Sequence, residues 1–330
     1  MTATRRTVLA VPASSDRFIA KARTLDVDAL FLDLEDAVAP AVKVESRARI
    51  VEALNTGEFA APLLTVRVNG WESPWTYADV IEVVSGAGAR IDALVLPKTQ
   101  DAAQVKALDL LLTQVEQIAG LPVGRIGLEV QIEDAVGLLH VDEIAAASPR
   151  LASLVFGPGD FMASLGMGGL SVGNQPEGYP ADAFHHVLMS ILVAARAHGL
   201  QAIDGPYVAI RDVDGFRRSA ALSAALGYDG KWVLHPAQVE AGNQLFSPKQ
   251  TDFDRALRIQ AAYAQATAVA GGAVGAIVVD EEMVDEAGVK LAASIMARGR
   301  AAGMVSGADR PIPPASVQVS DEQYEKASGR

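Results

Sequence analysis

The sequence predicts a (β/α)8 barrel followed by a helical C-terminal appendage. Short apolar runs that end in polar, Gly or Pro residues recur eight times, and segments long enough for a helix separate them. Strands that alternate with helices form a parallel sheet, because parallel neighbours need a crossover connection. Eight such units end near Phe246, which fits the size typical of this barrel, ~250 residues.

The strand candidates are, in order, TVLAVPASS, ALFLDLED, LLTVRVNG, IDALVLPKT, IGLEVQIED, LASLVFGPGD, LQAIDGPY and GKWVLHPAQ. Apolar residues at helical spacing predict helices between them, for example over 44–54, 102–119, 141–147, 184–198 and 214–226. An open doubly wound sheet is the alternative. It is disfavoured because no G-x-G-x-x-G follows the first strand, as a dinucleotide-binding fold requires.

The chain divides into three predicted parts. Residues 1–246 form the barrel, and residues 247–302 form the appendage, with helices over 251–270 and 287–298 around the Gly-flanked extended segment GGAVGAIVVDEEMVD. The remaining tail, 303–330, is Pro-rich and polar, and such composition predicts disorder.

Composition excludes several classes of protein and site. The chain has 330 residues, a net charge of -12 and no cysteine, which rules out disulfides and thiolate metal sites and is compatible with a reducing cytoplasm. The acidic balance argues against a nucleic-acid partner. The apolar run over 8–12 is too short for an export signal, and no other segment is apolar enough to span a bilayer. We therefore expect a cytoplasmic protein that binds neither nucleic acid nor membrane.

Charged residues gather where the predicted strands end, which in a barrel is the mouth of the active site. Glu129 and Asp160 are the predicted metal ligands, since Mg²⁺, with Mn²⁺ as an alternative ion, prefers carboxylate oxygens and keeps positions open for substrate. Glu35 and Asp36 of FLDLEDAV would contact metal-bound water or pair with Arg67. A metal and an arginine would thus offset the acidic cluster.

Each of these residues also has a purely structural interpretation. Glu35 and Asp36 could begin a helix, where carboxylates are favourable. Asp160 could cap the following turn, and Arg67 could form a structural ion pair. Paired carboxylates could also cleave glycosides, but the chain has few aromatics, and Arg67 and Lys98 favour an anionic substrate.

Taken together, several motifs resemble the citrate lyase beta-subunit family, within the aldolases related to pyruvate kinase barrels. They are FLDLEDAV, TVRVNG, LVLPK, LEVQIED, FGPGDFMASLG, IDGPY and ALGYDGKWVLHPAQV. The segments IDGPYVAIRDVDGF and GYDGKWVLHPAQ most resemble the corresponding sequences of the malyl-CoA and methylmalyl-CoA lyase branch. The resemblance extends from Thr7 to about Ala301.

The resemblance implies a Mg²⁺-dependent lyase that cleaves a 3-hydroxyacyl-CoA, such as malyl-CoA, into an acyl-CoA and a 2-oxo acid. By motif, Arg67 would bind the oxo-acid carboxylate and act in catalysis, and Glu129 and Asp160 would hold Mg²⁺. Arg17 and Lys21 of SSDRFIAKA match positions that contact the CoA phosphates.

The family resemblance also implies an assembly. Relatives are trimers or hexamers, and Asp285 matches a catalytic aspartate that a neighbouring subunit supplies. The structural alternative for Asp285 is a helix N-cap. Two features depart from the family: Asp280, Glu281 and Glu282 replace a DGR sequence, and FHHVLMSIL lacks an arginine.

Other functions stay open at this stage. The substrate could be citramalyl-CoA, hydroxymethylglutaryl-CoA or a citryl thioester, or the same site could hydrolyse malyl-CoA as a thioesterase. From a different class, the chain could be a CoA-binding protein without turnover.

Overall fold

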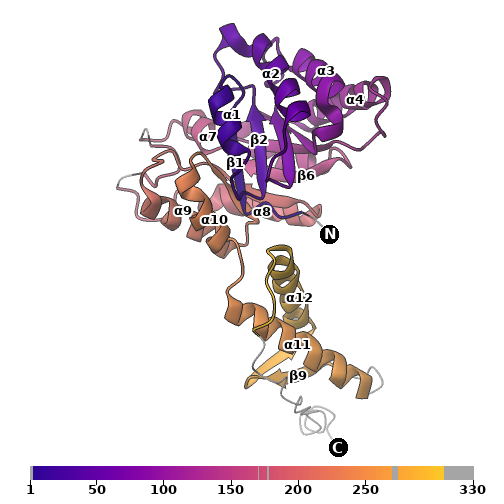
Figure 1. Ribbon diagram of the computed structural model, residues 1–330. Coiled ribbons are helices and arrows are strands. Elements are labelled where there is room, and N and C mark those ends of the chain that lie inside the picture. Colours follow the sequence, from indigo (N-terminus) through magenta and orange to yellow (C-terminus); the bar gives the residue numbers. More distant parts are fainter. Residues whose placement is uncertain (1–2, 170, 177, 270–273, 308–330) are drawn as a thin grey trace, which may run out of the picture. The chain divides into compact units, whose positions relative to one another are not determined.

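The structure is a computed structural model that describes residues 3–169, 171–176, 178–269 and 274–307 (Figure 1). The chain divides into two compact units, Met1–Phe246 and Ser247–Arg330.

The first unit is a closed barrel of eight parallel strands in sequence order, in which β8 pairs with β1 (Figure 1). All eight strand candidates are confirmed. The strands are β1 (Thr7–Pro12), β2 (Ala29–Asp33), β3 (Leu63–Arg67), β4 (Ala93–Leu96), β5 (Gly127–Ile132), β6 (Leu151–Phe156), β7 (Gln201–Asp204) and β8 (Gly230–Val233).

Helices connect these strands and cover the barrel. They are α1 (Asp16–Ala22), α2 (Lys43–Thr56), α3 (Thr76–Ala87), α4 (Ala102–Ile118), α5 (Ala135–Leu139), α6 (Val141–Ala145), α7 (Pro158–Leu165), α8 (His185–Ala197), α9 (Val213–Leu226) and α10 (Pro236–Leu245), with short 3₁₀ turns at Pro40–Val42 and Gly88–Arg90. Outward residues of the strands, such as Leu30 and Leu32, join the large core between the sheet and the helices. The predicted (β/α)8 fold is confirmed.

Inward residues form layers along the barrel axis. A central apolar layer contains Val8, Ala29, Phe31, Val95, Val155, Ile203 and Trp232. Phe31 and Trp232 pack with ring centroids 4.3 Å apart. Buried ion pairs lie on both sides of this layer, Asp33–Arg67 on one side and Arg5–Glu129 on the other, so the apolar plug separates two polar regions inside one barrel.

The second unit contains α11 (Gln250–Val269), the antiparallel strands β9 (Ala276–Val279) and β10 (Glu282–Asp285), and α12 (Glu286–Ala301). A small core of its own includes Ala256, Ile259, Ile277 and Val284. Residues 303–307 follow α12, and Gly307 N donates to Asp254 at 3.1 Å. The rest of the tail predicted to be disordered, 308–330, lies outside the described residues. No helix in the described part of either unit is long and apolar enough to cross a membrane.

Candidate active site

Arg67, the last residue of β3, is held by Asp33, the last residue of β2. The two positions pair in register, and both side chains point into the barrel. Arg67 donates from Nε to Asp33 Oδ1 at 2.7 Å and from Nη2 to Oδ2 at 2.6 Å. Such a bidentate, charge-assisted pair fixes the plane of the guanidinium. Burial alone would lower the pKa of Arg67, but the charge and hydrogen bonds of Asp33 outweigh burial and raise it.

The guanidinium also sits on the apolar plug of the barrel. Its central carbon lies 5.5 Å from the Phe31 ring centroid and 5.4 Å from that of Trp232. Nη1 points to Gln131 Oε1 at 3.3 Å and to Glu35 Oε2 at 3.1 Å. Arg67 therefore forms the floor of the polar region at the carboxyl ends of the strands.

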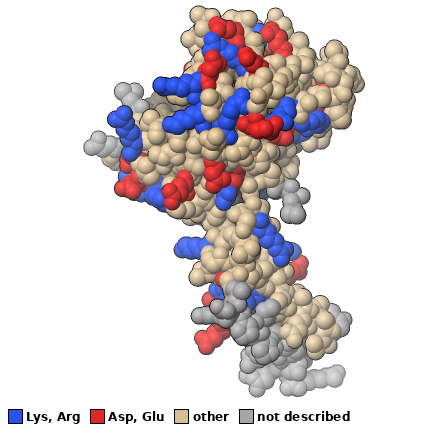
Figure 2. Space-filling view, viewed as in Figure 1, with Lys and Arg blue, Asp and Glu red and all other residues tan. Residues whose placement is uncertain are grey.

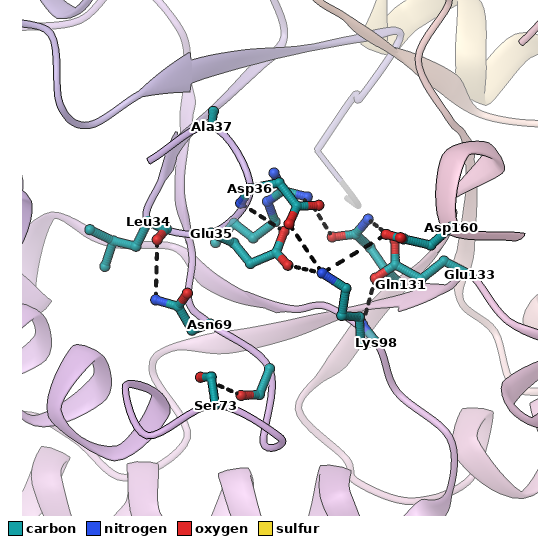
Figure 3. A network of polar contacts seen from close by, with 12 residues as sticks. Leu34, Glu35, Asp36, Ala37, Asn69, Ser73, Lys98, Gln131, Glu133 and Asp160 are labelled. Carbon is teal, nitrogen blue, oxygen red and sulfur yellow. Dashed lines mark hydrogen bonds and ion pairs between the residues drawn. The ribbon is translucent and has the colours of Figure 1, made fainter. Parts of the chain in front are cut away.

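Glu35 and Asp36 form one wall of this region, just after β2 (Figure 3). Glu35 is buried, and burial raises its pKa despite the nearby charge of Arg67. Asp36 N donates to Glu35 Oε2 at 3.0 Å. Burial would raise the pKa of Asp36, but hydrogen bonds from Glu35 and Lys98 and the charge of Lys98 hold it below its usual value. Both carboxylates face the ammonium of Lys98.

Glu133 forms the opposite wall, at the first position after β5. Only 4% of it is exposed. Its Oε1 accepts a 2.6 Å hydrogen bond from the backbone N–H of Lys98, and its Oε2 accepts one from Gln131 at 3.0 Å. Burial, with the added repulsion of Asp160 and Glu35, raises the pKa of Glu133 to about 8 although Lys98 N–H and Arg67 oppose the shift.

Gly157 makes room for this carboxylate. A Cβ at position 157 would lie 2.4 Å from both Cβ and Oε2 of Glu133, which is far inside van der Waals contact. Gly157, the first glycine of FGPGDF, is therefore needed for Glu133 to lie across the end of β6. The sequence analysis gave no role to either residue, although Glu133 shares the period-2 face of Glu129 and Gln131.

Asp160 stands beside Glu133, in the first turn of α7 after β6. Its carboxylate is 44% exposed and lies 3.9 Å from Lys98 Nζ. Figure 3 shows Glu133, Asp160 and Lys98 gathered at one place, with Glu35 and Asp36 on the other side of the ammonium. The predicted grouping of Asp160, Glu35, Asp36 and Arg67 in one region is what the structure shows.

Glu129 does not belong to this group, and the prediction that it shares a metal ion with Asp160 needs correction. Its Oε1 accepts a 2.8 Å hydrogen bond from Arg5 Nε, and only 1% of its side chain is exposed. Arg5 precedes β1 and also contacts Gln201, the first residue of β7, so this pair belongs to the amino ends of the strands. Four residues of strand separate Glu129 from Glu133, or about 13 Å. The carboxylate of LEVQIED that reaches Asp160 is therefore Glu133.

Comparisons with known proteins identify the family of the chain. A family model described as HpcH/HpaI aldolase/citrate lyase matches residues 6–236. The chain belongs to this family. The resemblance inferred from the motifs is confirmed.

Several relatives of this HpcH/HpaI chain have assigned activities or structures with bound ligands. The L-malyl-CoA/beta-methylmalyl-CoA lyase of Cereibacter sphaeroides is 39% identical over 89% of this chain and 93% of its own length. A (3S)-malyl-CoA thioesterase of the same species is 36% identical over 90% of this chain and 95% of its own. The structure of CitE from Mycobacterium tuberculosis with magnesium, acetoacetate and coenzyme A has a TM-score of 0.68, with 28% identity over 91% of this chain and 100% of that one. The family and its lyases make the chain a carbon–carbon lyase.

The donor set at the mouth of this HpcH/HpaI barrel fits a divalent cation. Hard carboxylate oxygens predominate: five carboxylates face two cations, Arg67 and Lys98, the acidic members being Asp33, Glu35, Asp36, Glu133 and Asp160. Burial, together with the negative charges of Asp160 and Glu35, raises the pKa of Glu133, and a cation bound beside it would favour its charged form. Within the described ranges no three or more His, Asp or Glu side chains already form a ligand set. Water or substrate would complete the coordination of an ion on Glu133 and Asp160, as Mg²⁺ commonly allows.

The predicted CoA contacts, Arg17 and Lys21, lie on α1. Both are exposed, and the described residues give neither of them an ion pair. Ser15 caps this helix by accepting from Phe18 N. On the face seen in Figure 2, basic and acidic side chains are interspersed over the barrel. Arg17 and Lys21 remain predicted phosphate ligands.

Asp285 lies in the second unit, where it is the N-cap of α12. Its Oδ1 accepts a 3.0 Å hydrogen bond from Gly288 N, so the structural alternative weighed for this residue is realised in the chain. The carboxylate is exposed and keeps lone pairs for another partner. Its catalytic role remains a prediction.

The barrel unit also has a cavity of about 740 Å³ that none of the clustered carboxylates lines. Asp204 and Lys231, which form a buried pair with Nζ 2.6 Å from Oδ2, lie in its wall with Tyr207 and Leu222. The carboxylate cluster at the carboxyl ends of the strands and this cavity are therefore separate features of the barrel unit.

Proposed function

We propose that the protein is a Mg²⁺-dependent lyase that cleaves a 3-hydroxyacyl-CoA, such as L-malyl-CoA or β-methylmalyl-CoA, to acetyl-CoA or propionyl-CoA and glyoxylate, or catalyses the reverse condensation. The observation that carries the proposal is the pairing of Glu133 and Asp160 across a site whose floor is an arginine. Relatives at 39% identity named as malyl-CoA lyases support this substrate class.

Arg67 would bind the carboxylate of the 2-oxo acid. Asp33 already occupies Nε and one N–H of Nη2, and Nη1 contacts Gln131 and Glu35. A substrate carboxylate would therefore accept from the second N–H of Nη2 and replace one of the contacts of Nη1. Because Asp33 fixes the guanidinium plane, the substrate carboxylate would meet donors that need no reorganisation. Asp33 is thus a positioning residue.

Glu133 and Asp160 would hold the cation, which, when bound, stabilises negative charge on the substrate oxygens as a Lewis acid. In cleavage the substrate hydroxyl loses its proton, its oxygen forms the carbonyl of the oxo acid, and the carbon–carbon bond breaks. The electron pair passes to the thioester as an enolate. Glu35, whose pKa is raised by burial, would receive the hydroxyl proton through water, with Asp36 beside it.

The enolate must then be protonated on carbon. Asp285 from a neighbouring subunit is our candidate acid, in a homotrimer or hexamer, with Arg17 and Lys21 on the CoA phosphates. Asp285→Ala should keep Mg²⁺ binding and lower turnover. If this variant loses Mg²⁺ binding, Asp285 is a metal ligand and the proposed role is wrong.

The test is a panel of hydroxyacyl-CoA thioesters incubated with Mg²⁺, then with a chelator, and analysed by mass spectrometry for both fragments. We expect malyl-CoA to give glyoxylate and acetyl-CoA only with Mg²⁺. Citramalyl-CoA and hydroxymethylglutaryl-CoA identify the other lyase substrates. No cleavage of any thioester, despite ligand binding in calorimetry, would contradict the proposal.

Hydrolysis of malyl-CoA is the second candidate, because a thioesterase is 36% identical over 90% of the chain. Free malate and free CoA, with no glyoxylate, are its products. The same panel separates the two reactions.

A further inference from the structure

Lys98 adopts a backbone conformation that is costly for its residue type. It follows β4 and Pro97, and its φ is +50°. The other described non-glycine residues with positive φ are Asp280 and Glu281, which form the tight turn between β9 and β10, where this conformation is usual. Lys98 has no such turn to explain it. Strained backbone of this kind is found where a site requires a particular geometry.

The strained conformation lets Lys98 contact both walls of the site at once. Its backbone N–H donates to Glu133 Oε1 at 2.6 Å. Its ammonium contacts Glu35 Oε1, lies 3.1 Å from Asp36 Oδ1 and lies 3.9 Å from Asp160 Oδ2. One residue therefore holds every carboxylate of the cluster except Asp33, which Arg67 holds.

A second lysine nearby shows what a purely structural role looks like. Lys43 Nζ donates to the backbone oxygens of Leu34 and Glu35 and to Asn69 Oδ1, at 2.7, 2.8 and 2.7 Å. Lys43 is 7% exposed, and its three donors have three neutral acceptors. The side chain of Lys98 is 33% exposed and contacts only carboxylates.

We propose that Lys98 is a positioning residue that acts as the resident counter-ion of the carboxylate cluster, so that a divalent cation binds between Glu133 and Asp160 only by driving the ammonium away from Asp160. This inference rests on the metal site of the proposed function. It goes beyond that function because it assigns to Lys98 the control of metal affinity, a role that the proposed reaction does not require.

The sign of the effect follows from charge. An ammonium 3.9 Å from a ligand oxygen lies within the distance at which a cation bound to that oxygen would repel it. Without the ammonium of Lys98, its positive charge no longer offsets the carboxylates, and the divalent cation no longer competes with the ammonium for them. Metal binding should therefore become tighter when Lys98 is neutral, whereas loss of a merely structural ion pair would leave metal affinity unchanged or weaken it.

The experiment is calorimetric titration of the full chain with Mg²⁺. Lys98→Met, which keeps the unbranched stem, should bind Mg²⁺ at least tenfold more tightly than the wild type. Lys98→Arg keeps the charge and should stay within about threefold of the wild type. Lys106→Met removes an exposed lysine from α4 and controls for net charge. Unchanged or weaker Mg²⁺ binding by Lys98→Met overturns the inference.

A second measurement avoids any variant. Crystal structures of the wild-type protein with and without Mg²⁺ should show Lys98 Nζ near Asp160 only in the metal-free form. An ammonium that stays 3.9 Å from Asp160 Oδ2 beside bound Mg²⁺ overturns the inference even if Lys98→Met does not fold. Loss of the metal site itself is distinguishable: a wild type that binds no Mg²⁺ contradicts both the inference and the proposed function, whereas normal wild-type binding with an unchanged Lys98→Met contradicts only the inference.

Discussion

Glu129 and Glu133 lie four residues apart on the same inward face of β5 and its extension, yet their surroundings are opposite. Glu129 meets one cation, Arg5, at 2.8 Å and is sealed from solvent. Glu133 shares its region with four other carboxylates, and burial with this repulsion raises its pKa to about 8. Phe31 and Trp232 separate the two levels. The comparison teaches that charge balance, rather than residue type, distinguishes a structural carboxylate from one suited to bind a metal.

The largest effect is expected when the carboxylates at the mouth of the barrel are neutralised. Glu133→Gln or Asp160→Asn should abolish measurable Mg²⁺ binding and lower kcat/KM for malyl-CoA by about 10³-fold or more, since the main electrostatic stabilisation is lost. Calorimetry and steady-state kinetics measure both effects. Activity within a few-fold of wild type for either variant would show that the ion binds elsewhere.

A substitution of Arg67 that keeps its positive charge should have a smaller effect. Arg67→Lys keeps the cation but cannot make the bidentate contact with Asp33, so we expect kcat/KM to fall about 10²-fold, with most of the loss in the KM for glyoxylate in the condensation direction. Thermal unfolding of the same variant checks that the barrel remains intact. A KM for glyoxylate that does not change would remove Arg67 from substrate binding.

The raised pKa of Glu133 predicts a pH-dependent affinity for metal. A carboxyl with a pKa of about 8 in the folded, metal-free protein is largely protonated at pH 7, and a metal binds the deprotonated form. Mg²⁺ binding at pH 7 should therefore release nearly one proton, and affinity should rise as the pH approaches 8. Calorimetry in buffers of different ionisation enthalpy counts the proton.

The same shift has a consequence for stability without metal. The pKa of Glu133 in the folded protein lies above the ordinary glutamate value of 4.5, so the stability associated with this group is complete below about pH 4.5 and is lost as the pH rises through 8. Glu133→Gln should remove this contribution from the pH profile of the metal-free protein. An identical profile in wild type and variant would assign the titration to another group.

The smallest effect on catalysis is expected for the matched change at the other end of the barrel. Glu129→Gln should leave kcat/KM within a few-fold of wild type, because its partner Arg5 lies beyond the apolar plug. It should still lower the free energy of unfolding by about 1.5–3 kcal/mol, the range for a hydrogen bond to a charged group. Denaturant unfolding measures this loss. Glu129→Gln with intact stability and no activity would restore Glu129 as a site residue.

Much of the fold and part of the site followed from the sequence. Each strand is short, apolar and bounded by polar, Gly or Pro residues, so local pattern was enough to count eight strands and to predict a parallel barrel. Because parallel strands end at one face, the same pattern also predicted that Glu35, Asp36, Arg67 and Asp160 would meet. The choice between Glu129 and Glu133 could not be made in this way, because alternation gives the face of a residue but not its depth along the axis.

The sequence by itself determined the architecture and the types of side chain at the mouth, because strand length, alternation and chain order are local properties. The tertiary structure alone decided which carboxylate faces Asp160, that Asp33 fixes Arg67, and that Lys98 lies between the acidic walls. The hydrogen bonds of Asp33 and Lys98 in this group join residues 34 to 63 positions apart. They depend on the stagger of neighbouring strands and on the room left by Gly157, which are properties of the closed barrel and of no single segment.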